Sequence, residues 1–391
     1  MKRLSILGST GSIGANACDV VRNHPGRFEI VGLAAGRNVD LLAAQIEAFQ
    51  PEVVAVIDEE HARRLERLLG TGRKPSVLWG TEGYREVAAL PAADMVLSAM
   101  VGAAGLLPTL TAIEAGKAVA LANKETLVMA GELVMERARS RGVSILPVDS
   151  EHSAVFQCLS GQRHQDVRRI ILTASGGPFW NLSKEEMEKV TAAQALRHPN
   201  WKMGDKITVD SASMMNKGLE VIEAKWLFGI DIERIDVVVH PRSIVHSMVE
   251  YRDGSIIGQI GVPDMRIPIG YALSYPERLT ACEGNHLNLL EAGPLEFFRP
   301  DFEKFPNLRL AFEAARAGGT MPTVLNAANE IAVSAFLGGS IGFLQMPLVI
   351  GKVLSEHEQT ASRAIDVILR ADDWARKRAA EIIEEIKNCS E

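Results

Sequence analysis

Over residues 1–148, short apolar runs alternate with segments whose apolar residues recur every three to four positions. The apolar runs are typical of buried strands, and the periodic segments predict amphipathic helices between them. The predicted strands are residues 3–7, 28–34, 53–57, 95–98, 118–121 and 143–147. The predicted helices include residues 13–22, 41–49, 62–69, 108–115 and 127–139. Such alternation indicates an α/β fold with a Rossmann-type parallel sheet covered by helices on both faces.

The pattern changes after residue 149. Predicted strands at 169–173, 237–239, 245–251 and 255–260 follow without a helix between each pair, and Arg252-Asp253-Gly254 predicts a hairpin turn. Residues 275–306 are rich in proline and have little periodicity, whereas only helical periods remain after Leu308. We therefore predict a dinucleotide-binding domain at 1–148 and a central α+β catalytic domain at 149–274. A linker at 275–306 and a carboxy-terminal helical bundle at 307–391 complete the predicted division.

Charge and composition narrow the class of protein. Lys and Arg total 42 and Asp and Glu total 49, giving a net charge of −7 without a basic cluster, so nucleic acid is not an expected partner. The values of 47% apolar and 23% charged residues are typical of folded globular chains. The uncharged stretch 95–113 is long enough to span a membrane, but it contains Gly102, Gly105 and Pro108. We interpret it as a strand, a loop and a helix, and expect no membrane association.

The cysteines and the amino terminus predict a compartment. Cys18, Cys158, Cys282 and Cys389 lie far apart with no Cys-x-x-Cys pair, so neither a disulfide framework nor a thiolate metal site is indicated. The first predicted strand begins directly after Met1-Lys2, which leaves no room for the apolar region of a signal peptide. We expect a cytoplasmic location.

A glycine-rich turn follows the first predicted strand. Gly8, Gly11 and Gly14 have the spacing Gly-x-x-Gly-x-x-Gly and lead into a helix. Glycines permit a tight turn and close approach of backbone N–H groups to a pyrophosphate, and the helix N-terminus adds partial positive charge. The alternative is a strand-to-helix turn that binds nothing.

The end of the second predicted strand favours NADP over NAD. NAD sites usually carry an acidic residue here for the ribose hydroxyls, but this chain has Gly36, Arg37 and Asn38. The Arg37 guanidinium suits a 2′-phosphate, and Asn38 adds a donor. The alternative is that Arg37 is an ordinary surface arginine.

Three acidic residues are candidates for a metal site. Asp149 and Glu151 follow the last strand of the predicted sheet, and in an extended segment their side chains would point to the same side. If Glu220 converges on them, the mutual repulsion of the carboxylates requires a cation. Oxygen ligands alone select a hard divalent ion, Mg²⁺ or Mn²⁺. Solvated turns and helix caps are the alternative interpretation.

Two segments are able to hold a phosphate. Ser175-Gly176-Gly177 follows a strand, while Ser211, Asn216 and Lys217 supply donors and one positive charge near a helix start. Lys124 ends another strand, where it is able to reach a substrate hydroxyl. A glycine turn, a serine cap and exposed lysines are the ordinary alternatives.

Residues 198–204, His-Pro-Asn-Trp-Lys-Met-Gly, are typical of a lid that excludes water on closing. The aromatic Trp201 is otherwise a core residue, and His198 taken alone is more often structural. We interpret His152, His240 and His246 as structural histidines.

Taken together, these motifs resemble the 1-deoxy-D-xylulose 5-phosphate reductoisomerase family. The matching segments are Gly-Ser-Thr-Gly-Ser-Ile-Gly, Leu-Ala-Asn-Lys-Glu, Pro-Val-Asp-Ser-Glu-His, Ala-Ser-Gly-Gly-Pro-Phe, His-Pro-Asn-Trp-Lys-Met-Gly, Val-Asp-Ser-Ala-Ser-Met-Met-Asn-Lys-Gly-Leu-Glu and Leu-Asn-Ala-Ala-Asn-Glu. In this order they cover residues 4 to about 337. The resemblance implies an NADPH-dependent and Mg²⁺- or Mn²⁺-dependent enzyme of isoprenoid precursor synthesis by the methylerythritol phosphate pathway, usually a homodimer.

The resemblance also implies a role for each matching residue. The metal ligands would be Asp149, Glu151 and Glu220, and the catalytic set would add Lys124 and His198. The substrate phosphate would bind Ser175, Ser211, Asn216 and Lys217, while Lys124 and Ser150 would contact substrate hydroxyls. His198, Trp201 and Met203 would form a closing flap over the sugar phosphate. The NADPH site would comprise Thr10, Gly11, Ser12, Ile13, Gly36, Arg37, Asn38, Asn123, Glu125 and Gly204.

The implied reaction rearranges 1-deoxy-D-xylulose 5-phosphate to an aldehyde, by retro-aldol cleavage or an α-ketol shift, and reduces it to 2-C-methyl-D-erythritol 4-phosphate without a covalent nucleophile. Two other interpretations remain open at this point. A semialdehyde or homoserine type of NADP dehydrogenase would work without metal, and the semialdehyde type needs a reactive cysteine. A regulator that senses NADP would not need the three acidic residues at all.

Overall fold

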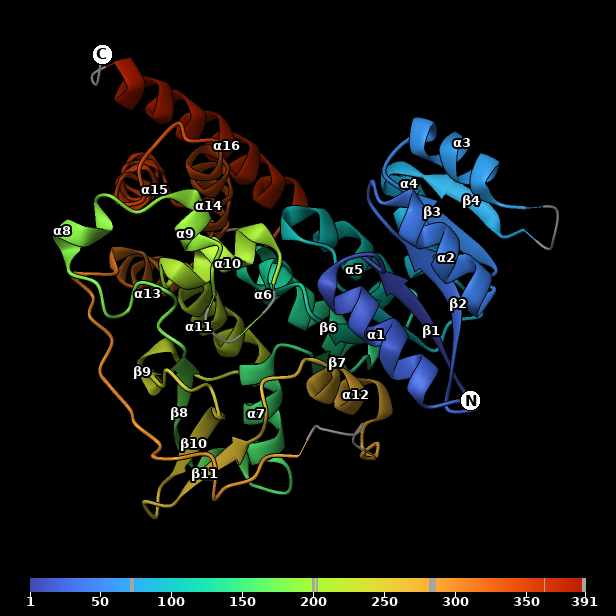
Figure 1. The fold of residues 1–391 in the computed structure, drawn as a ribbon, viewed down its shortest axis with the longest axis horizontal. Coiled ribbons are helices and arrows are strands. Elements are labelled where there is room, and N and C mark those ends of the chain that lie inside the picture. The colour runs from blue at the N-terminus through green and yellow to red at the C-terminus, as the bar shows by residue number, and fades with distance from the viewer. Residues whose placement is uncertain (71–73, 199–200, 202, 281–285, 362, 389–391) are drawn as a thin grey trace. The chain divides into compact units, whose positions relative to one another are not determined.

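The computed structural model describes residues 1–70, 74–198, 201, 203–280, 286–361 and 363–388. The chain divides into two compact units (Figure 1). The first contains Met1–Thr126, Val134–Ser153 and Asp264–His286, and the second contains Leu127–Leu133, Ala154–Pro263 and Leu287–Glu391.

The first unit is built on a seven-stranded parallel sheet with the order β4-β3-β2-β1-β5-β6-β7. Its strands are β1 (Lys2–Leu7), β2 (Phe28–Ala34), β3 (Val53–Val56), β4 (Ser76–Trp79), β5 (Met95–Ser98), β6 (Ala118–Leu121) and β7 (Ile145–Pro147). The connecting helices are α1 (Ser12–Asn23), α2 (Val39–Phe49), α3 (Glu59–Leu68), α4 (Gly80–Ala88), η1 (Gly102–Gly105), α5 (Leu106–Glu114) and α6 (Lys124–Arg141). The predicted Rossmann-type sheet is confirmed.

The strand order places a topological switch between β1 and β5. From β1 the chain adds strands to one side as far as β4, and then returns to place β5 on the other side of β1. In open α/β sheets, ligands bind at the carboxyl ends of the two strands that flank such a switch. Leu7 and Ser98 end these strands, so the glycine turn at Gly8 lies where a ligand is expected.

The sequence pattern missed β4 and α4. The β4 side chains are exposed or half-buried, since this strand is the edge of the sheet, and its apolar run Val77-Leu78-Trp79 is too short to distinguish a strand from other structure. The stretch 95–113 forms β5, η1 and all of α5 except its last residue, so the strand and the helix are as predicted. Within the part of the chain that the structure describes, no helix is both long and apolar enough to cross a membrane.

The second unit combines a four-stranded sheet, with the order β11-β10-β8-β9, and a group of helices (Figure 1). Its strands are β8 (Val167–Ala174), β9 (Ile235–Val239), β10 (Val245–Tyr251) and β11 (Ile256–Ile260). Its helices are the body of α7 (Ser150–Leu159), η2 (His164–Asp166), α8 (Lys184–Met187), α9 (Ala192–Ala195), α10 (Asp205–Ala212), α11 (Met215–Phe228), η3 (Ile232–Arg234), α13 (Pro306–Ala317), α14 (Met321–Leu337), α15 (Gln345–Glu356) and α16 (Ile365–Asn388). The predicted α+β region and helical bundle are both confirmed.

One apolar core holds the second unit together. It joins the inner face of the sheet to α11, α13, α14, α15 and α16. On α16, Ala375, Ala379, Ile382 and Ile383 form the buried face that the helical period predicts. The segments at the ends of β8 and α10, which are predicted to bind phosphate, are therefore attached to a close-packed core.

The compact units do not follow the predicted domain boundaries in every detail. Helix α12 (Arg266–Ser274) was assigned by its sequence position to the central domain, but it belongs to the first unit and packs against α1. Secondary structure alone cannot show this, because the return of a chain segment depends on long-range contacts. The division at 148, 274 and 306 stays a prediction.

Candidate active site

The glycine turn after β1 is too tightly packed for side chains. Gly8 has φ +86°, and a Cβ atom built on it would lie 2.4 Å from the carbonyl oxygen of Ala99, the residue after β5. A Cβ atom on Gly14 would lie 2.3 Å from the Gly8 carbonyl oxygen. Only glycine permits this approach of α1 to the turn. The packing brings the start of α1 to the switch point of the sheet.

The N-terminus of α1 is open to a ligand. Gly11 is its N-cap and supplies no side-chain hydrogen bond, so the first N–H groups of the helix are not satisfied by a cap. Gly11 and Ser12 are exposed, and Thr10 and Ile13 are half-buried. Since these N–H groups carry partial positive charge, the turn is suited to a pyrophosphate, as predicted for NADPH.

The end of β2 presents Gly36, Arg37 and Asn38 to solvent. The Asn38 side-chain oxygen accepts a hydrogen bond from the Leu41 N–H at 3.1 Å and caps α2, so its amide NH₂ is the group left for a ligand. No carboxylate lies in the loop after β2. The geometry therefore agrees with a cationic site for a 2′-phosphate.

Arg37→Asp is expected to raise the KM for NADPH by about 10²-fold, because a charge-assisted contact to a phosphate becomes a repulsion. Arg37→Lys, which keeps the positive charge, is the matched control and should change KM less than about threefold. Steady-state kinetics with NADPH and NADH measure both variants. An unchanged NADPH KM in Arg37→Asp would show that Arg37 is an ordinary surface residue.

Asn123 is a structural residue in this structure. Its side chain is 2% exposed, caps α6 by accepting from the Thr126 N–H at 3.0 Å, and donates to the Gly102 carbonyl at 3.0 Å and to Glu125 at 3.3 Å. It therefore holds the loop after β5 in place at the carboxyl-terminal edge of the sheet. Its predicted contribution to the NADPH site, and that of Glu125, stays a prediction.

The acidic segment after β7 is helical, so the prediction of an extended segment was wrong. The Ser153 N–H donates to the Asp149 carbonyl at 2.8 Å, and α7 begins at Ser150. Asp149 and Glu151 nevertheless present carboxylate oxygens within 4.8 Å of each other. The Ser150 hydroxyl donates to Glu151 at 2.6 Å. The start of α7 therefore brings the two carboxylates close together, as the extended segment was expected to do.

Lys124 forms a buried ion pair with Asp149. The lysine side chain is 6% exposed and the aspartate side chain 15%. Lys124 is the first residue of α6, shortly after β6, and Asp149 lies between β7 and α7. The two strands are neighbours in the sheet. The predicted substrate lysine and the predicted metal ligand thus occupy the same edge of the sheet in the first unit.

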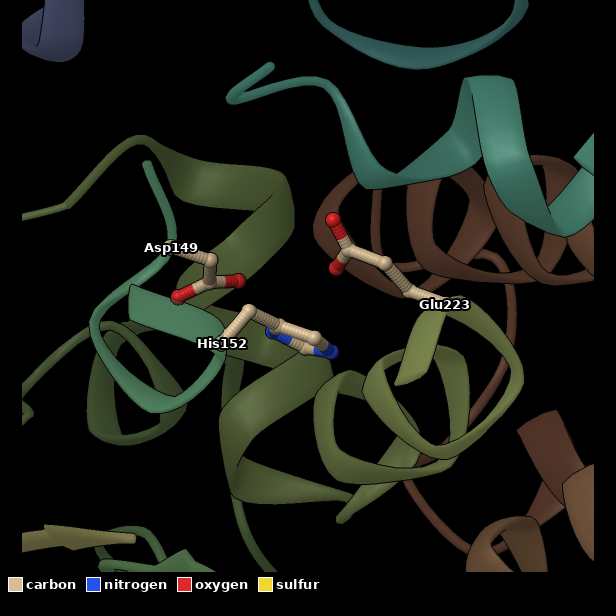
Figure 2. Close-up of side chains that lie close together, drawn as sticks. All are labelled: Asp149, His152 and Glu223. Carbon is tan, nitrogen blue, oxygen red and sulfur yellow. The ribbon is translucent and has the colours of Figure 1, made fainter. Parts of the chain in front are cut away.

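His152 lies beside Asp149, a proximity that the sequence did not indicate. It is fully buried in the first turn of α7, and a ring nitrogen lies within 4.8 Å of an Asp149 carboxylate oxygen (Figure 2). Residues three apart are neighbours on a helix but not in an extended segment, so a helix at this position would have predicted the contact.

The third acidic residue is held in the second unit by its own helix. Glu220 on α11 is fully buried and accepts a hydrogen bond from the Asn216 amide at 2.5 Å. Lys217 forms an ion pair with the other carboxylate oxygen of Glu220. Glu223, one turn further along α11, is also buried (Figure 2).

Each unit therefore holds one predicted metal ligand against one predicted substrate lysine. Buried carboxylates and ammonium groups are costly to leave unpaired, so each ion pair offsets part of the cost of burying both side chains. A divalent cation is able to take the place of the ammonium group beside a carboxylate. The lysine would then be available for an oxygen of the substrate, so the residues present fit an oxygen-ligated metal ion.

The two predicted phosphate segments meet in the second unit. A Cβ atom built on Gly177, which has φ +70°, would lie 2.6 Å from the Ser211 carbonyl oxygen. The turn after β8 therefore packs directly on the end of α10. Ser211 lies in the last turn of α10 rather than at a helix start, and Asn216 and Lys217 follow in the first turn of α11.

His198 and Ser175 form a hydrogen-bonded pair with defined roles. The Trp201 N–H lies 3.0 Å from His198 Nδ1, so Nδ1 is the acceptor and the neutral ring carries its proton on Nε2. Nε2 then donates to the Ser175 hydroxyl at 3.1 Å, which also accepts from the Gly177 N–H at 3.2 Å. The hydroxyl proton of Ser175 is consequently directed away from both donors. It is suited to donate to a phosphate oxygen.

Burial lowers the pKa of His198 from 6.5 to about 4. The unfolded chain binds this proton below pH 6.5 and the folded chain only near pH 4, so the folded state loses stability as the pH falls through this window. We expect the stability difference between the wild type and His198→Asn to shrink by on the order of 1 kcal/mol from pH 7 to pH 4.5, after allowance for solvent screening. Urea unfolding at both pH values measures it. A constant difference would contradict the neutral ring.

The structure describes part of the predicted flap. Trp201 and Met203 are half-buried, Gly204 is exposed, and the Trp201 ring centroid lies 6.4 Å from that of His246. Pro199, Asn200 and Lys202 lie outside the described residues. His240 stacks on Phe297 and bonds the Glu296 carbonyl at 2.8 Å, as a structural histidine does.

The two cysteines that the structure describes are unsuited to nucleophilic catalysis. Cys18 and Cys158 are both buried and not in a disulfide. Burial raises the pKa of Cys18 to about 12 and that of Cys158 to about 11. Since the thiolate is the nucleophile, neither is reactive near neutral pH. Cys282 and Cys389 lie outside the described residues.

Comparison with known proteins identifies the family. The model described as 1-deoxy-D-xylulose 5-phosphate reductoisomerase matches residues 4–131, and the models of two carboxy-terminal domains of this enzyme match residues 145–228 and 260–378. The reductoisomerase of Chlorobium limicola is 58% identical over 98% of this chain and 100% of its own length. That of Citrifermentans bemidjiense is 56% identical over 98% and 99%.

Solved structures agree with the sequence matches. The reductoisomerase of Zymomonas mobilis in complex with NADPH is 43% identical, with a TM-score of 0.91 over 98% of this chain and 99% of that chain. A reductoisomerase in complex with NADPH, fosmidomycin and magnesium is 42% identical, with a TM-score of 0.93 over 99% of each chain. The chain therefore belongs to the 1-deoxy-D-xylulose 5-phosphate reductoisomerase family.

Proposed function

We propose that this chain rearranges 1-deoxy-D-xylulose 5-phosphate and reduces it to 2-C-methyl-D-erythritol 4-phosphate. It is an NADP-dependent oxidoreductase that uses NADPH and a divalent metal ion. The observation that carries this conclusion is the 58% identity to a named reductoisomerase over 98% of the chain and all of the relative. The relatives solved with NADPH and with magnesium support both cofactors.

The proposed metal ligands are Asp149, Glu151 and Glu220. The support is their match to the family motifs and the oxygen-only donor set that they provide. Lys124 and Ser150 are proposed to bind substrate hydroxyls. The phosphate is proposed to bind the set Ser175, Ser211, Asn216 and Lys217.

The chemistry follows from where the side chains are anchored. When bound, the metal ion supplies Lewis-acid stabilisation of developing negative charge and NADPH supplies hydride. Lys217 and the Ser175 hydroxyl hold the phosphate, which lies away from the reacting carbons. The free energy of phosphate binding therefore serves to orient the rest of the substrate. Neutral His198 holds the Ser175 hydroxyl in its donating orientation. His198, Trp201 and Met203 are proposed to exclude water from the site.

The two rival interpretations have less support. A semialdehyde dehydrogenase needs a cysteine thiolate, whereas the described cysteines have raised pKa values. A regulator does not need Lys124 buried against Asp149 or Lys217 against Glu220. Both buried pairs carry a desolvation cost, and a binding site for metal and phosphate gives a reason for keeping these charges buried.

The test is NADPH oxidation, followed at 340 nm, with 1-deoxy-D-xylulose 5-phosphate in the presence and absence of EDTA. Oxidation should require the sugar phosphate, stop on chelation and return with excess Mg²⁺ or Mn²⁺. Oxidation that ignores the chelator would favour a plain dehydrogenase.

We further propose a cytoplasmic homodimer joined through β11. This strand is the edge of its sheet, and Ile256, Ile257 and Ile260 are 54%, 39% and 43% exposed. Successive residues of a strand point to opposite faces, so both faces of β11 are open, which is unfavourable for an isolated edge strand. A monomer mass in sedimentation equilibrium would contradict the dimer.

The proposed cytoplasmic location has separate support. Cys18 and Cys158 are free cysteines, as is usual for proteins of a reducing compartment.

A further inference from the structure

Helix α10 connects the flap to the proposed phosphate site. It spans Asp205–Ala212, about 12 Å, and follows directly after Gly204. Ser211 lies in its last turn, against the turn at Gly177. Any displacement of α10 along its axis therefore moves the flap end and the phosphate donors together.

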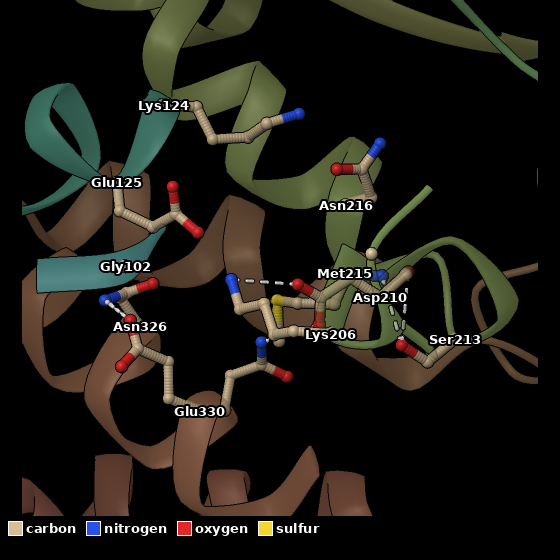
Figure 3. Close-up of polar contacts among 12 residues, drawn as sticks. Gly102, Lys124, Glu125, Lys206, Asp210, Ser213, Met215, Asn216, Asn326 and Glu330 are labelled. Atoms are coloured by element: carbon tan, nitrogen blue, oxygen red, sulfur yellow. Dashed lines mark hydrogen bonds and ion pairs between the residues drawn. The ribbon is translucent and has the colours of Figure 1, made fainter. Parts of the chain in front are cut away.

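A buried carboxylate anchors this helix. Asp210 is 1% exposed, and one of its oxygens pairs with Lys206 at 2.9 Å, one turn earlier on α10 (Figure 3). The other oxygen accepts a hydrogen bond from the Asn329 side-chain amide at 2.8 Å. Asn329 is fully buried on α14, which packs against α10. The contact therefore ties α10 to the core of the second unit.

Asp210 also supports the turn that starts α11. The Ser213 hydroxyl donates to the Asp210 carbonyl at 3.3 Å and accepts from the Met215 N–H at 3.4 Å. Between them, Met214 has φ +61°, a left-handed conformation that a residue with a side chain adopts only when its surroundings enforce it. Asn216 and Lys217 follow at once. The positions of Asn216 and Lys217 therefore depend on a turn that is hydrogen-bonded to the Asp210 backbone.

A second asparagine of α14 makes a different contact. Asn326, one turn before Asn329 and equally buried, donates to Glu330 at 3.0 Å (Figure 3). Glu330 pairs with Arg376 of α16 at 2.8 Å. Through Glu330, Asn326 is thus linked to Arg376 of α16 rather than to the Asp210 carboxylate. The motif Leu-Asn-Ala-Ala-Asn-Glu therefore contains two asparagines with separate tasks.

We propose that Asn329 is a positioning residue for the substrate phosphate. It acts through the Asp210 carboxylate, which it holds so that α10 and the Met214 turn present Ser211 and Lys217 at the correct spacing. This inference rests on the proposed phosphate site. An anchor that sets donor positions affects substrate affinity, whereas a residue that only stabilises the fold affects the amount of active enzyme.

The test compares Asn329→Ala with Asn326→Ala in the full chain. We expect Asn329→Ala to raise the KM for 1-deoxy-D-xylulose 5-phosphate about tenfold, because one oxygen of a buried carboxylate loses its donor. The kcat should change less than about threefold, and the KM for NADPH less than about twofold. Asn326→Ala, the matched control, should leave the sugar phosphate KM unchanged. A fall in kcat with an unchanged substrate KM would overturn the proposal.

A carboxylate–amide exchange keeps the test decisive if Asn329→Ala folds poorly. Asn329→Asp places two carboxylates against each other and should raise the substrate KM further. Adding Asp210→Asn restores a donor and an acceptor and should lower that KM again. A double variant no better than Asn329→Asp would overturn the proposal.

Lys217→Gln separates failure of this inference from failure of the proposed phosphate site. If Lys217→Gln leaves the substrate KM unchanged, the phosphate site itself is misplaced. If Lys217→Gln raises the KM and Asn329→Ala does not, only the positioning role is wrong.

Discussion

Glu220→Gln should lower kcat by about 10³-fold while NADPH binding persists. The amide keeps the size of the side chain but removes the negative charge from a proposed metal ligand, and Lewis-acid stabilisation is worth several kcal/mol, at 1.36 kcal/mol per factor of ten. Initial rates at saturating Mg²⁺ give kcat, and quenching of protein fluorescence gives the dissociation constant of NADPH. The apparent metal affinity should fall in the same variant.

Glu250→Gln is the matched control for that result. Glu250 is a buried carboxylate, 5% exposed, that pairs with Arg168 and Arg169 on β8 outside the proposed site. The loss of this carboxylate should lower the melting temperature and leave kcat within a few-fold of the wild-type value. Asp149→Asn and Glu151→Gln should follow Glu220→Gln. Full activity in any two of these three variants would exclude the proposed metal ligands.

Lys217→Gln should raise the KM for 1-deoxy-D-xylulose 5-phosphate by about 10²-fold. Glutamine keeps a donor for Glu220 but removes the charge that is proposed to bind the phosphate, and a lost charge contact in a desolvated site costs about 2–5 kcal/mol. The KM for NADPH should change little. Steady-state kinetics with each substrate varied in turn separate the two effects.

Lys225→Ala provides the control on the same helix. Lys225 lies two turns after Lys217 on α11, and its amine donates to the Ala315 carbonyl at 2.9 Å rather than to a carboxylate. It should lower the melting temperature without a change in substrate KM. If both lysine variants raised the KM equally, the effect would belong to α11 as a whole and not to a phosphate contact.

The local elements were predictable because their signals are short-range. The buried strands β1, β2, β5 and β6 appear as apolar runs with nearly the observed bounds, since both faces of a parallel sheet are covered. The edge strand β4 has only the short apolar run Val77-Leu78-Trp79, which did not suffice to predict it. The helical start at Asp149 was missed for a similar reason, because Asp-Ser-Glu-His fits a turn, an extended segment or a helix cap equally well.

Family motifs placed the proposed site residues, but not their partners. The sequence indicated Lys124, Asp149, Lys217 and Glu220 as separate functional groups. It did not indicate the pair of Lys124 and Asp149, which lie on different elements. Lys217 and Glu220 are three residues apart on α11, but the burial of their pair depends on tertiary packing. Asn329 was visible only as part of a motif. Its contact with Asp210 joins positions far apart in the chain.

The order of amino acids by itself determined the parallel sheet, the glycine turn after β1, the use of NADPH and the family, because each depends on neighbouring residues or on ordered motifs. Only the tertiary structure decided which charged groups are buried against each other and how α10 is anchored. Those outcomes depend on long-range packing, which sets the distance, the desolvation and the hydrogen-bond geometry of each pair.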